Sequence, residues 1–278
     1  MLPRRYLATV FRKLRNTPRN SLAPHRNRAK STTPHMISDE FRFKLLVKLG
    51  SLIFKQYPFK WSQLDWLRNP WFSGYLQKFG EERGLNRERR WILQELIRLV
   101  ETVPGDTAEC GAFEGAGSYL ICHANAANSN FNRVHHVFDS FEGLSTPAAV
   151  DGAYWHKGDM SRGEDIVRKN LTEFSAYELH KGWIPERFVD VKEKHFAFVH
   201  IDVDLYQPTL DSMSFFYERM NPGGIIVCDD YGFTTCPGAT RAVNETLRDK
   251  PEKMIALPDG GGFLIKGIST SSRGALDT

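Results

Sequence analysis

The sequence predicts an α/β fold: a doubly wound, mostly parallel sheet of seven strands that ends in an antiparallel hairpin. From Gly105 onward, short apolar runs alternate with longer segments of helical periodicity, the pattern of βα units. The last two runs, 254–257 and 263–266, leave almost no room for a helix between them, so they are expected to pair as a hairpin. The 278 residues are 41% hydrophobic, which is enough for one sizeable core.

The part of the chain that precedes this pattern is predicted to be a helical preface or lid over residues 39–103. From Asp39, apolar side chains recur three or four residues apart, and a second amphipathic helix is expected over 86–103. A tryptophan-rich stretch lies between the two helices. We expect its aromatic rings to pack the preface against the body, with direct substrate contact as the alternative: Trp61, Trp66 and Trp71.

The sheet is predicted to occupy residues 104–268, followed by a flexible tail over 269–278. Its expected strands are 107–110, 134–138, 177–180, 196–201, 224–228 and the two hairpin strands, and its expected helices are 117–127, 164–174, 208–220 and 238–248. The segment 140–163 has no clear periodicity, and loops of that length are typically functional or mobile. In such sheets, ligands bind at the carboxyl ends of the strands.

The basic character of the chain is confined to its N-terminus. Residues 1–38 contain nine Lys or Arg and no acid, so the remainder carries a net charge of −5 although the whole chain has +4. The predicted domain therefore gives no electrostatic reason to expect a nucleic acid partner. The arm has the composition of an organelle transit peptide, or of a disordered segment that contacts a membrane surface. We expect a cytoplasmic protein, or an organelle protein if the arm directs import.

The remaining composition narrows the class of protein further. With 25% charged residues and no apolar run near the roughly 20 residues of a spanning helix, the chain is neither a multi-span membrane protein nor wholly disordered. The four cysteines show no CxxC pair, and Cys110 and Cys228 lie inside strand-like runs. Buried free thiols in a reducing compartment are therefore expected.

A glycine-rich turn follows the first predicted strand and leads directly into a helix. It runs from Glu109 through Gly111 to Gly117, and glycines there let a ligand approach the backbone. Asp139 ends the second predicted strand, where an acid can accept hydrogen bonds from both hydroxyls of a ribose. An adenosine-bearing cofactor is predicted, either a dinucleotide or S-adenosylmethionine. The G-x-G-x-x-G motif of dinucleotide sites fails at Leu120, and a leading carboxylate suits a cationic cofactor better.

Acidic side chains end two consecutive predicted strands. Asp202 and Asp204 close one strand, on the same side by strand alternation, and Asp229 and Asp230 close the next. If the strands are neighbours, four carboxylates converge at the ligand-binding edge, where Mg²⁺ with its oxygen ligands is the natural partner. The alternative is that the acids cap the following helices, but a cap explains one acid per strand end and not two.

The sequence shows no competing catalytic motif. There is no G-x-S-x-G elbow, no P-loop and no H-E-x-x-H helix. The histidines are scattered along the chain. His135, His195 and His200 lie in or beside predicted strands, where a single His is more often a hydrogen-bonded structural residue than a catalyst.

Five blocks in this order resemble the macrocin O-methyltransferase family, over roughly residues 100–265. They are Glu109-Cys110-Gly111, Phe138 to Leu144, Gly182-Trp183, His200 to Tyr206, and Pro222-Gly223-Gly224 leading to Asp229-Asp230-Tyr231. The resemblance implies a class I methyltransferase fold of the Rossmann-like type and methylation of sugar hydroxyls in macrolides and related natural products. It implies S-adenosyl-L-methionine and Mg²⁺ as cofactors, a small-molecule hydroxyl acceptor as partner, and is compatible with a homo-oligomer.

The resemblance also implies roles for individual residues. Asp202, Asp229 and Asp230 match the Mg²⁺ ligands of the family, and Asp204 matches the carboxylate proposed as general base. The expected cofactor contacts are Glu109 and Gly111 at the methionine part, Asp139 at the ribose, Ser140 and Phe141 beside the adenine, and Gly182 and Trp183 as a further adenine-side contact.

Two other interpretations stay open. One is a nucleotide-binding or interaction protein of the same fold without transfer activity, against which the presence of all four acids argues. The other is an NAD-dependent oxidoreductase, which the failed glycine spacing disfavours.

Overall fold

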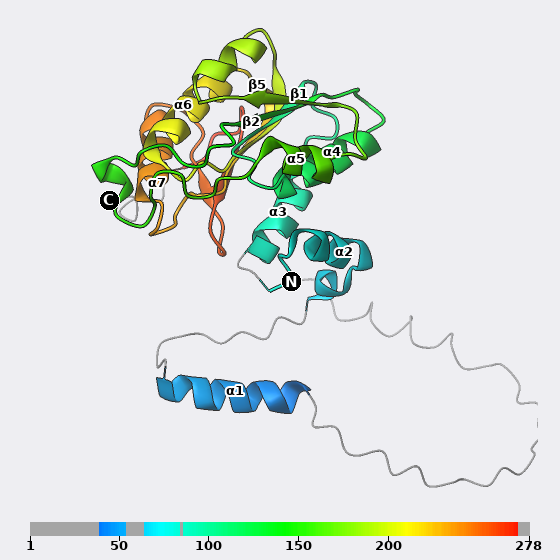
Figure 1. Ribbon diagram of the computed structural model, residues 1–278, viewed down its shortest axis with the longest axis vertical. Helices are drawn as coiled ribbons and strands as arrows, with labels where there is room; N and C mark the ends of the chain where they lie inside the picture. The colour runs from blue at the N-terminus through cyan, green and yellow to red at the C-terminus, as the bar shows by residue number, and fades with distance from the viewer. Residues whose placement is uncertain (1–38, 54–63, 84–85, 272–278) are drawn as a thin grey trace, which may run out of the picture. The chain divides into compact units, whose positions relative to one another are not determined.

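The computed structural model of the chain describes residues 39–53, 64–83 and 86–271 (Figure 1). The chain divides into two compact units, Met1–Gln63 and Leu64–Thr278. In the first unit, α1 (Asp39–Ile53) confirms the helix predicted from Asp39. The basic arm over 1–38, Trp61 and most of the predicted tail, from residue 272, lie outside the described residues.

The second unit is built on a seven-stranded sheet in the order β3-β2-β1-β4-β5-β7-β6. Its first five strands, which are neighbours in the sheet, all run parallel: β1 (Asp106–Cys110), β2 (His135–Asp139), β3 (Tyr177–Lys181), β4 (Phe196–Ile201) and β5 (Met220–Cys228). The hairpin of β6 (Ile255–Ala256) and β7 (Gly262–Ile265) adds to β5 in antiparallel fashion. The predicted doubly wound sheet with a closing antiparallel hairpin is therefore confirmed.

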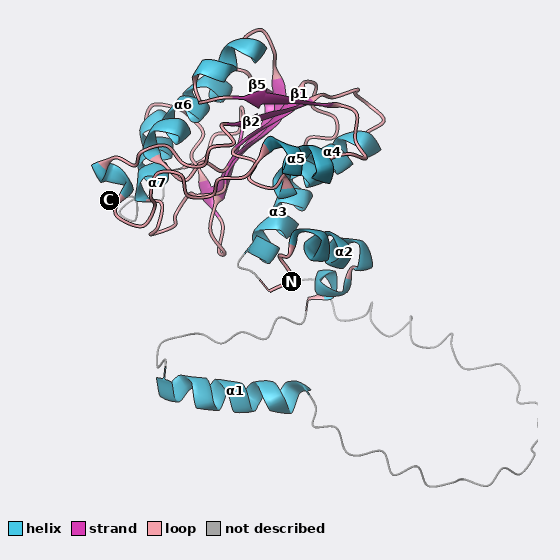
Figure 2. Cartoon of the chain, in the orientation of Figure 1, coloured by secondary structure: helices cyan, strands magenta, loops and turns pink. Residues whose placement is uncertain are grey.

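Helices cover both faces of the sheet, as Figure 2 shows. α3 (Asn86–Arg98), α4 (Ala116–Ala127) and α5 (Glu164–Asn170) pack on one face, and η3 (Glu186–Val191), α6 (Tyr206–Tyr217) and α7 (Pro237–Thr246) pack on the other. Strand alternation divides the core accordingly: Val137 belongs to the first hydrophobic cluster and its neighbour Phe138 to the second. The parallel strands thus lie between two layers of helices, one on each face of the sheet.

A helix that was not predicted, α2 (Pro70–Phe79), follows the short 3₁₀ turn η1 (Asp65–Arg68). The sequence nevertheless contains the residues that mark both ends of this helix. The Asn69 side chain caps the helix by accepting from the Phe72 amide, Pro70 occupies the first turn, and Gly80 ends it in the left-handed conformation.

The helices α2 and α3 share a compact unit with the sheet, and the two units of the chain meet at Gln63 and Leu64. The physical reason is burial, because Phe72, Leu76 and Leu96 belong to the same cluster as the sheet residues. Trp66 stacks on Trp91 of α3, within the predicted preface, with ring centroids 5.1 Å apart. Trp71 contacts the ring of His123 of α4, at 4.4 Å between centroids, so this tryptophan does pack the preface against the body.

Several helix boundaries differ from the prediction. α3 ends at Arg98 and not at 103, because the carbonyls of Val100 and Val103 accept hydrogen bonds from the buried side chain of Arg133, at 2.6 and 2.5 Å. α5 ends at Asn170 rather than 174, and β5 begins at Met220, where a helix was expected to end. Cys110 and Cys228 are buried free thiols, as predicted. Within the described ranges, no helix has the length and apolar character that crossing a membrane requires.

Candidate active site

Two adjoining cavities open where the parallel strands end. The first encloses about 180 Å³ and is lined by Asp139, Ser140, Gly182 and Trp183, among others. The second encloses about 310 Å³ and is lined by residues of α3, α4 and the loop after β5. Both cavities share part of one wall, formed by Gly111, Phe113, Met160, Asp202 and Asp204. Two ligands bound side by side would therefore meet at Asp202 and Asp204.

Asp139 organises the turns around the first cavity. Its Oδ2 accepts hydrogen bonds from the amides of Ala112 (2.7 Å) and Phe113 (3.2 Å), and its Oδ1 accepts from the amide of Phe141 (2.7 Å). The carboxylate, at the end of β2, thus joins the loop after β1 to the loop after β2. Any further hydrogen bond to a ligand in the cavity would use an acceptor that is already held in place.

The structure brings most of the predicted cofactor residues to the first cavity. Gly111, Asp139, Ser140, Gly182 and Trp183 line it, and 38% of the Trp183 surface is exposed. Phe141 does not line it, because its ring packs in the hydrophobic core, where it is only 8% exposed.

Glu109 is buried beneath the glycine turn, and its carboxylate oxygens already have hydrogen-bond partners. It is 2% exposed and lines the second cavity, but both carboxylate oxygens are engaged, one by the hydroxyl of Ser118 and the other by His200 Nδ1 at 2.7 Å. Its direct contact with a cofactor stays a prediction, while its contact with His200 ties β1 to β4.

Asp204 occupies an unusual turn directly after β4. Its φ is +60°, a left-handed conformation that Asp and Asn tolerate better than most residues. Asp230 holds this turn, because its Oδ2 accepts from the amides of Val203 (3.1 Å) and Asp204 (2.8 Å). One of the four predicted acids therefore positions another.

The neighbouring strands β4 and β5 bring all four acids to one edge of the sheet, in two groups of candidate ligands. His200, Asp202 and Asp229 form one group, and Asp204, Asp230 and Cys236 form the other; the candidate ligand atoms within each group lie within 4.8 Å of one another. The predicted Mg²⁺ ligands Asp202, Asp229 and Asp230 are thus drawn from both groups, and their joint role as ligands stays a prediction.

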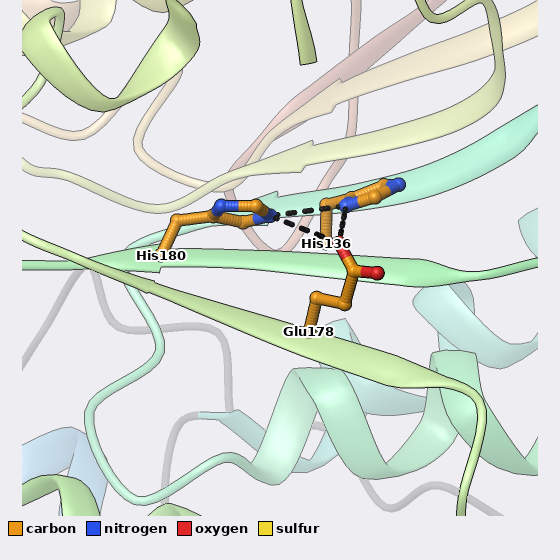
Figure 3. A group of neighbouring side chains, drawn as sticks. All are labelled: His136, Glu178 and His180. Atoms are coloured by element: carbon orange, nitrogen blue, oxygen red, sulfur yellow. Dashed lines mark hydrogen bonds and ion pairs between the residues drawn. The ribbon is translucent and has the colours of Figure 1, made fainter. Parts of the chain in front are cut away.

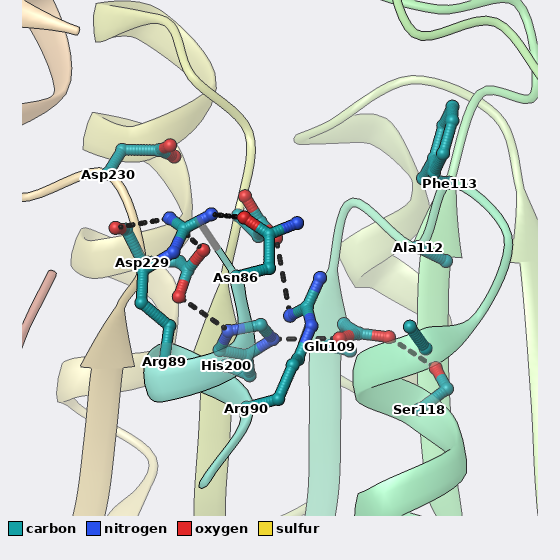
Figure 4. Close-up of polar contacts among 12 residues, drawn as sticks. Asn86, Arg89, Arg90, Glu109, Ala112, Phe113, Ser118, His200, Asp229 and Asp230 are labelled. Atoms are coloured by element: carbon teal, nitrogen blue, oxygen red, sulfur yellow. Dashed lines mark hydrogen bonds and ion pairs between the residues drawn. The ribbon is translucent and has the colours of Figure 1, made fainter. Parts of the chain in front are cut away.

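Two arginines of α3 face the acids, as Figure 4 shows. Arg89 Nη1 lies 2.5 Å from Asp229 Oδ2, and Arg89 also donates to Asn86 Oδ1 at 2.6 Å. Arg90 contacts both oxygens of Glu81 at 3.3 Å and lies 3.9 Å from Asp202 Oδ2. Arg89 therefore forms its ion pair with Asp229, and its positive charge stabilises Asp204 and Asp230 much less.

The pKa values follow this uneven distribution of charge. Burial and the charge of Asp229 raise the pKa of Asp202 to about 6, and burial and the charge of Asp202 raise the pKa of Asp204 to about 7. Burial likewise raises the pKa of Asp230. For Asp229, burial is outweighed by the ion pair with His200 and the charge of Arg89, and its pKa falls below the ordinary range.

The same partners act on His200. Burial alone would lower its pKa, but the ion pair with Asp229, at 3.7 Å, and the hydrogen bond to Glu109 raise it to about 9. His200 is fully buried and belongs to the network beneath the cavities.

The acid cluster fits a divalent cation. Asp202, Asp204, Asp229 and Asp230 offer carboxylate oxygens, the ligands that Mg²⁺ prefers. The raised pKa values of Asp202 and Asp204 come from burial and from mutual repulsion, which nearby positive charge does not fully offset. Asp202 and Asp230 line the second cavity, whereas Asp229 lies behind them against Arg89, a pair that must loosen if Asp229 Oδ2 is to bind an ion.

The second cavity has an aromatic wall. Phe79, Tyr154, Trp155 and Phe233 contribute to it, together with Arg89. Trp155 is held in place by a hydrogen bond from its indole nitrogen to Cys236 Sγ at 3.3 Å. Cavities lined by aromatic rings with a few charged groups are typical binding sites for small organic molecules.

Sequence reasoning missed Arg89, Arg90 and Trp155. The two arginines lie on a helix whose charged residues look like an ordinary solvent-exposed face, and no local pattern indicates that they point at acids of β4 and β5. Trp155 lies in the segment 140–163, whose unusual length was the available signal of function.

Comparison with known proteins provides independent evidence. The family model described as Macrocin-O-methyltransferase (TylF) matches residues 5–255. The chain is 28% identical over 186 residues to an 8-demethyl-8-(2,3-dimethoxy-alpha-L-rhamnosyl)-tetracenomycin-C 4'-O-methyltransferase of Streptomyces olivaceus, a match that covers 63% of this chain and 70% of that protein. It is 27% identical to a demethyldecarbamoylnovobiocin O-methyltransferase of Streptomyces niveus, over 51% of this chain and 58% of the relative.

Solved structures show the same fold. The calicheamicin methyltransferase CalS11 superposes with a TM-score of 0.59 at 18% identity, over 89% of this chain and all of that chain (100%). The O-methyltransferase NovP superposes with a TM-score of 0.55 at 20% identity, over 82% of this chain and 99% of the other. At these identities the superpositions establish the architecture alone.

Proposed function

Because the chain belongs to the macrocin O-methyltransferase family, and is thus an S-adenosylmethionine-dependent O-methyltransferase, we propose that it methylates a sugar hydroxyl of a glycosylated natural product with the help of Mg²⁺. The observation that carries the proposal is the pair of cavities that share Asp202 and Asp204 in their common wall. A methyl donor in one cavity and a hydroxyl acceptor in the other would meet at these carboxylates.

The first cavity is assigned to the cofactor. Asp139 would accept from the ribose hydroxyls, Ser140, Gly182 and Trp183 would lie at the adenine end, and Gly111 would allow the methionine end to pass close to the backbone. The support is their common location in one cavity, together with the hydrogen bonds that hold Asp139 in place.

The second cavity is assigned to the acceptor. Its aromatic wall of Tyr154, Trp155 and Phe233 offers the flat apolar surfaces on which sugar rings pack. The two named relatives are O-methyltransferases of natural-product substrates, and one of those substrates is a rhamnosyl compound. These observations support a glycosylated acceptor.

Within this site, the chain's own residues orient the reactants and move one proton. When bound, the cofactor supplies the methyl group, and Mg²⁺ at Asp202, Asp229 and Asp230 favours loss of the acceptor's hydroxyl proton. Asp204 lies in the wall common to both cavities, where its carboxylate can accept that proton. Asp230 holds the turn that presents Asp204, and the two cavities together align acceptor and donor.

Replacement of Asp139 by Ala is expected to weaken the binding of S-adenosylhomocysteine by about 2 kcal/mol or more, because charge-assisted hydrogen bonds to the ribose are lost. Isothermal titration calorimetry measures the effect, with NAD as the comparison ligand and with and without Mg²⁺. Unchanged affinity in the variant would remove Asp139 from the cofactor site. Tighter binding of NAD than of S-adenosylhomocysteine would overturn the proposed cofactor.

Single replacements of Asp202, Asp229 and Asp230 by Ala test the cation. Each is expected to lower Mg²⁺ affinity, and excess Mg²⁺ should restore part of the activity, since two carboxylate ligands are left. Metal affinity and methyl transfer are measured on each variant. Full activity in the presence of a strong chelator, for the unmodified protein and all three variants, would exclude the metal mechanism while leaving the methyltransferase assignment intact.

A further inference from the structure

A second cluster of candidate metal ligands lies on the outer strands of the sheet, away from the acid cluster. It comprises His136 of β2 with Glu178 and His180 of β3 (Figure 3). The parallel register sets His136 beside Glu178 and Phe138 beside His180. Because residues two apart along a strand share a face, all three side chains emerge on one side of the sheet. Their grouping is thus a consequence of strand pairing.

The facing atoms of the three side chains lie close together. His136 Nδ1 is 3.0 Å from His180 Nε2, Glu178 Oε2 is 3.4 Å from His136 Nδ1, and Glu178 Oε2 is 3.9 Å from His180 Nε2. Two ring nitrogens and one carboxylate oxygen therefore surround one small volume.

The outer nitrogen of each ring faces a second carboxylate. His136 Nε2 lies 3.3 Å from Asp106 Oδ2, and His180 Nδ1 lies 2.9 Å from Asp190 Oδ2. A carboxylate oxygen accepts hydrogen bonds, so each outer nitrogen must carry a proton and donate. In neutral rings, the inner nitrogens are then both unprotonated, and their lone pairs face each other across the small volume between the rings without a proton.

A hydrogen bond between two neutral rings does not resolve this conflict. If His136 Nδ1 donates to His180, then His136 Nε2 presents a lone pair to Asp106; if His180 Nε2 donates instead, then His180 Nδ1 presents one to Asp190. Either arrangement sets a nitrogen lone pair against a carboxylate. Only an added cation between the inner nitrogens satisfies all the partners at once.

We propose that His136, Glu178 and His180 bind a transition-metal ion of the zinc type. Tetrahedral Zn²⁺ with bonds of 2.0–2.2 Å sets its ligand atoms about 3.3 Å apart, and the observed separations lie around this value. Imidazole nitrogen with one carboxylate is a ligand set that zinc accepts, whereas Mg²⁺ prefers oxygen alone. Asp106 and Asp190 occupy the outer positions in which carboxylates orient metal-binding histidines.

The cluster also offers access and a free coordination position. The side chains of His136 and His180 are 1% and 8% exposed, which holds the rings rigid, while that of Glu178 is 60% exposed and faces solvent. An ion can enter on the Glu178 side and keep a water molecule there as its fourth ligand. Bound in this way, it clamps the edge strand β3 to β2 independently of methyl transfer.

The test is a titration of the full-length protein, first stripped of metal, with ZnCl₂ and a competing chromophoric chelator. Millimolar Mg²⁺ is present throughout to occupy the acid cluster. We expect one Zn²⁺ per chain with Kd below about 1 μM. Glu178→Gln should weaken binding at least about 10-fold and His180→Phe at least about 100-fold, since each removes a ligand.

The variants are chosen to preserve the fold. Phe at position 180 keeps the stacking on Phe138, whose ring centroid is 4.5 Å away, and Glu178 is largely exposed. Glu193→Gln, a change of the same kind at an exposed residue, is the matched control and should leave affinity unchanged. Equal affinity in all three variants, or no binding in this range by the unmodified protein, would overturn the proposal.

A second measurement identifies the cation between the rings. Long-range ¹H–¹⁵N spectra report the protonation of each histidine nitrogen, and Zn²⁺ should shift the signals of His136 Nδ1 and His180 Nε2 while both outer nitrogens stay protonated. A protonated ring pair whose signals do not respond to Zn²⁺ would show that a proton takes the place of the metal, and the proposal would fail.

Discussion

Replacement of Asp204 by Asn is expected to reduce turnover by about 10²- to 10⁴-fold, the usual range for loss of a general base. Asn matches Asp in shape and tolerates the φ of +60° at this position, so the turn should be preserved. The amide cannot accept the proton of the acceptor hydroxyl. Binding of Mg²⁺ and of S-adenosylhomocysteine should stay near normal, because the role proposed for Asp204 is proton transfer.

Turnover, metal affinity and cofactor affinity are therefore measured on Asp204→Asn beside Asp202→Ala. Asp249→Asn is the matched control, because Asp249 is exposed and lines neither cavity. If Asp204→Asn loses Mg²⁺ as severely as Asp202→Ala, then Asp204 is a ligand and the base must be sought elsewhere.

Replacement of Gly111 by Ala is expected to destabilise the protein by about 2–5 kcal/mol. The φ of Gly111 is +81°, which costs a residue with a side chain about 1–2 kcal/mol, and overpacking adds about 1–3 kcal/mol. A Cβ atom at this position would lie 1.9 Å from the backbone oxygen of Asp202, so the end of β4 would have to move. Cofactor binding should be lost with it.

Gly232→Ala separates the two causes. Gly232 has a φ of +84°, but a Cβ atom there would meet nothing within 4 Å, so only the conformational cost of about 1–2 kcal/mol is expected. Chemical denaturation of both variants gives the free energies of unfolding. Equal destabilisation would show that the approach of Gly111 to Asp202 relaxes without cost.

The predicted α/β fold is correct because its signals are local. Apolar runs and helical periodicity predicted the strands and most of the helices, and the short interval before the last strand predicted the hairpin. The errors occur where tertiary contacts override local pattern. α3 ends before 103 because Arg133 binds the carbonyls of Val100 and Val103, which follow the helix, and β5 extends back to Met220 because it pairs with β4 there.

The sequence by itself determined that acids end two buried strands, because a short apolar run followed by Asp residues is visible without any structure. Only the tertiary structure decided that Arg89, 140 residues from Asp229 along the chain, neutralises that acid, and that Asp202 and Asp204 lie in a wall shared by two cavities. The physical reason is the separation along the chain over which each signal acts. Periodicity reports which residues are buried, whereas the partners of a buried charge depend on how distant elements pack.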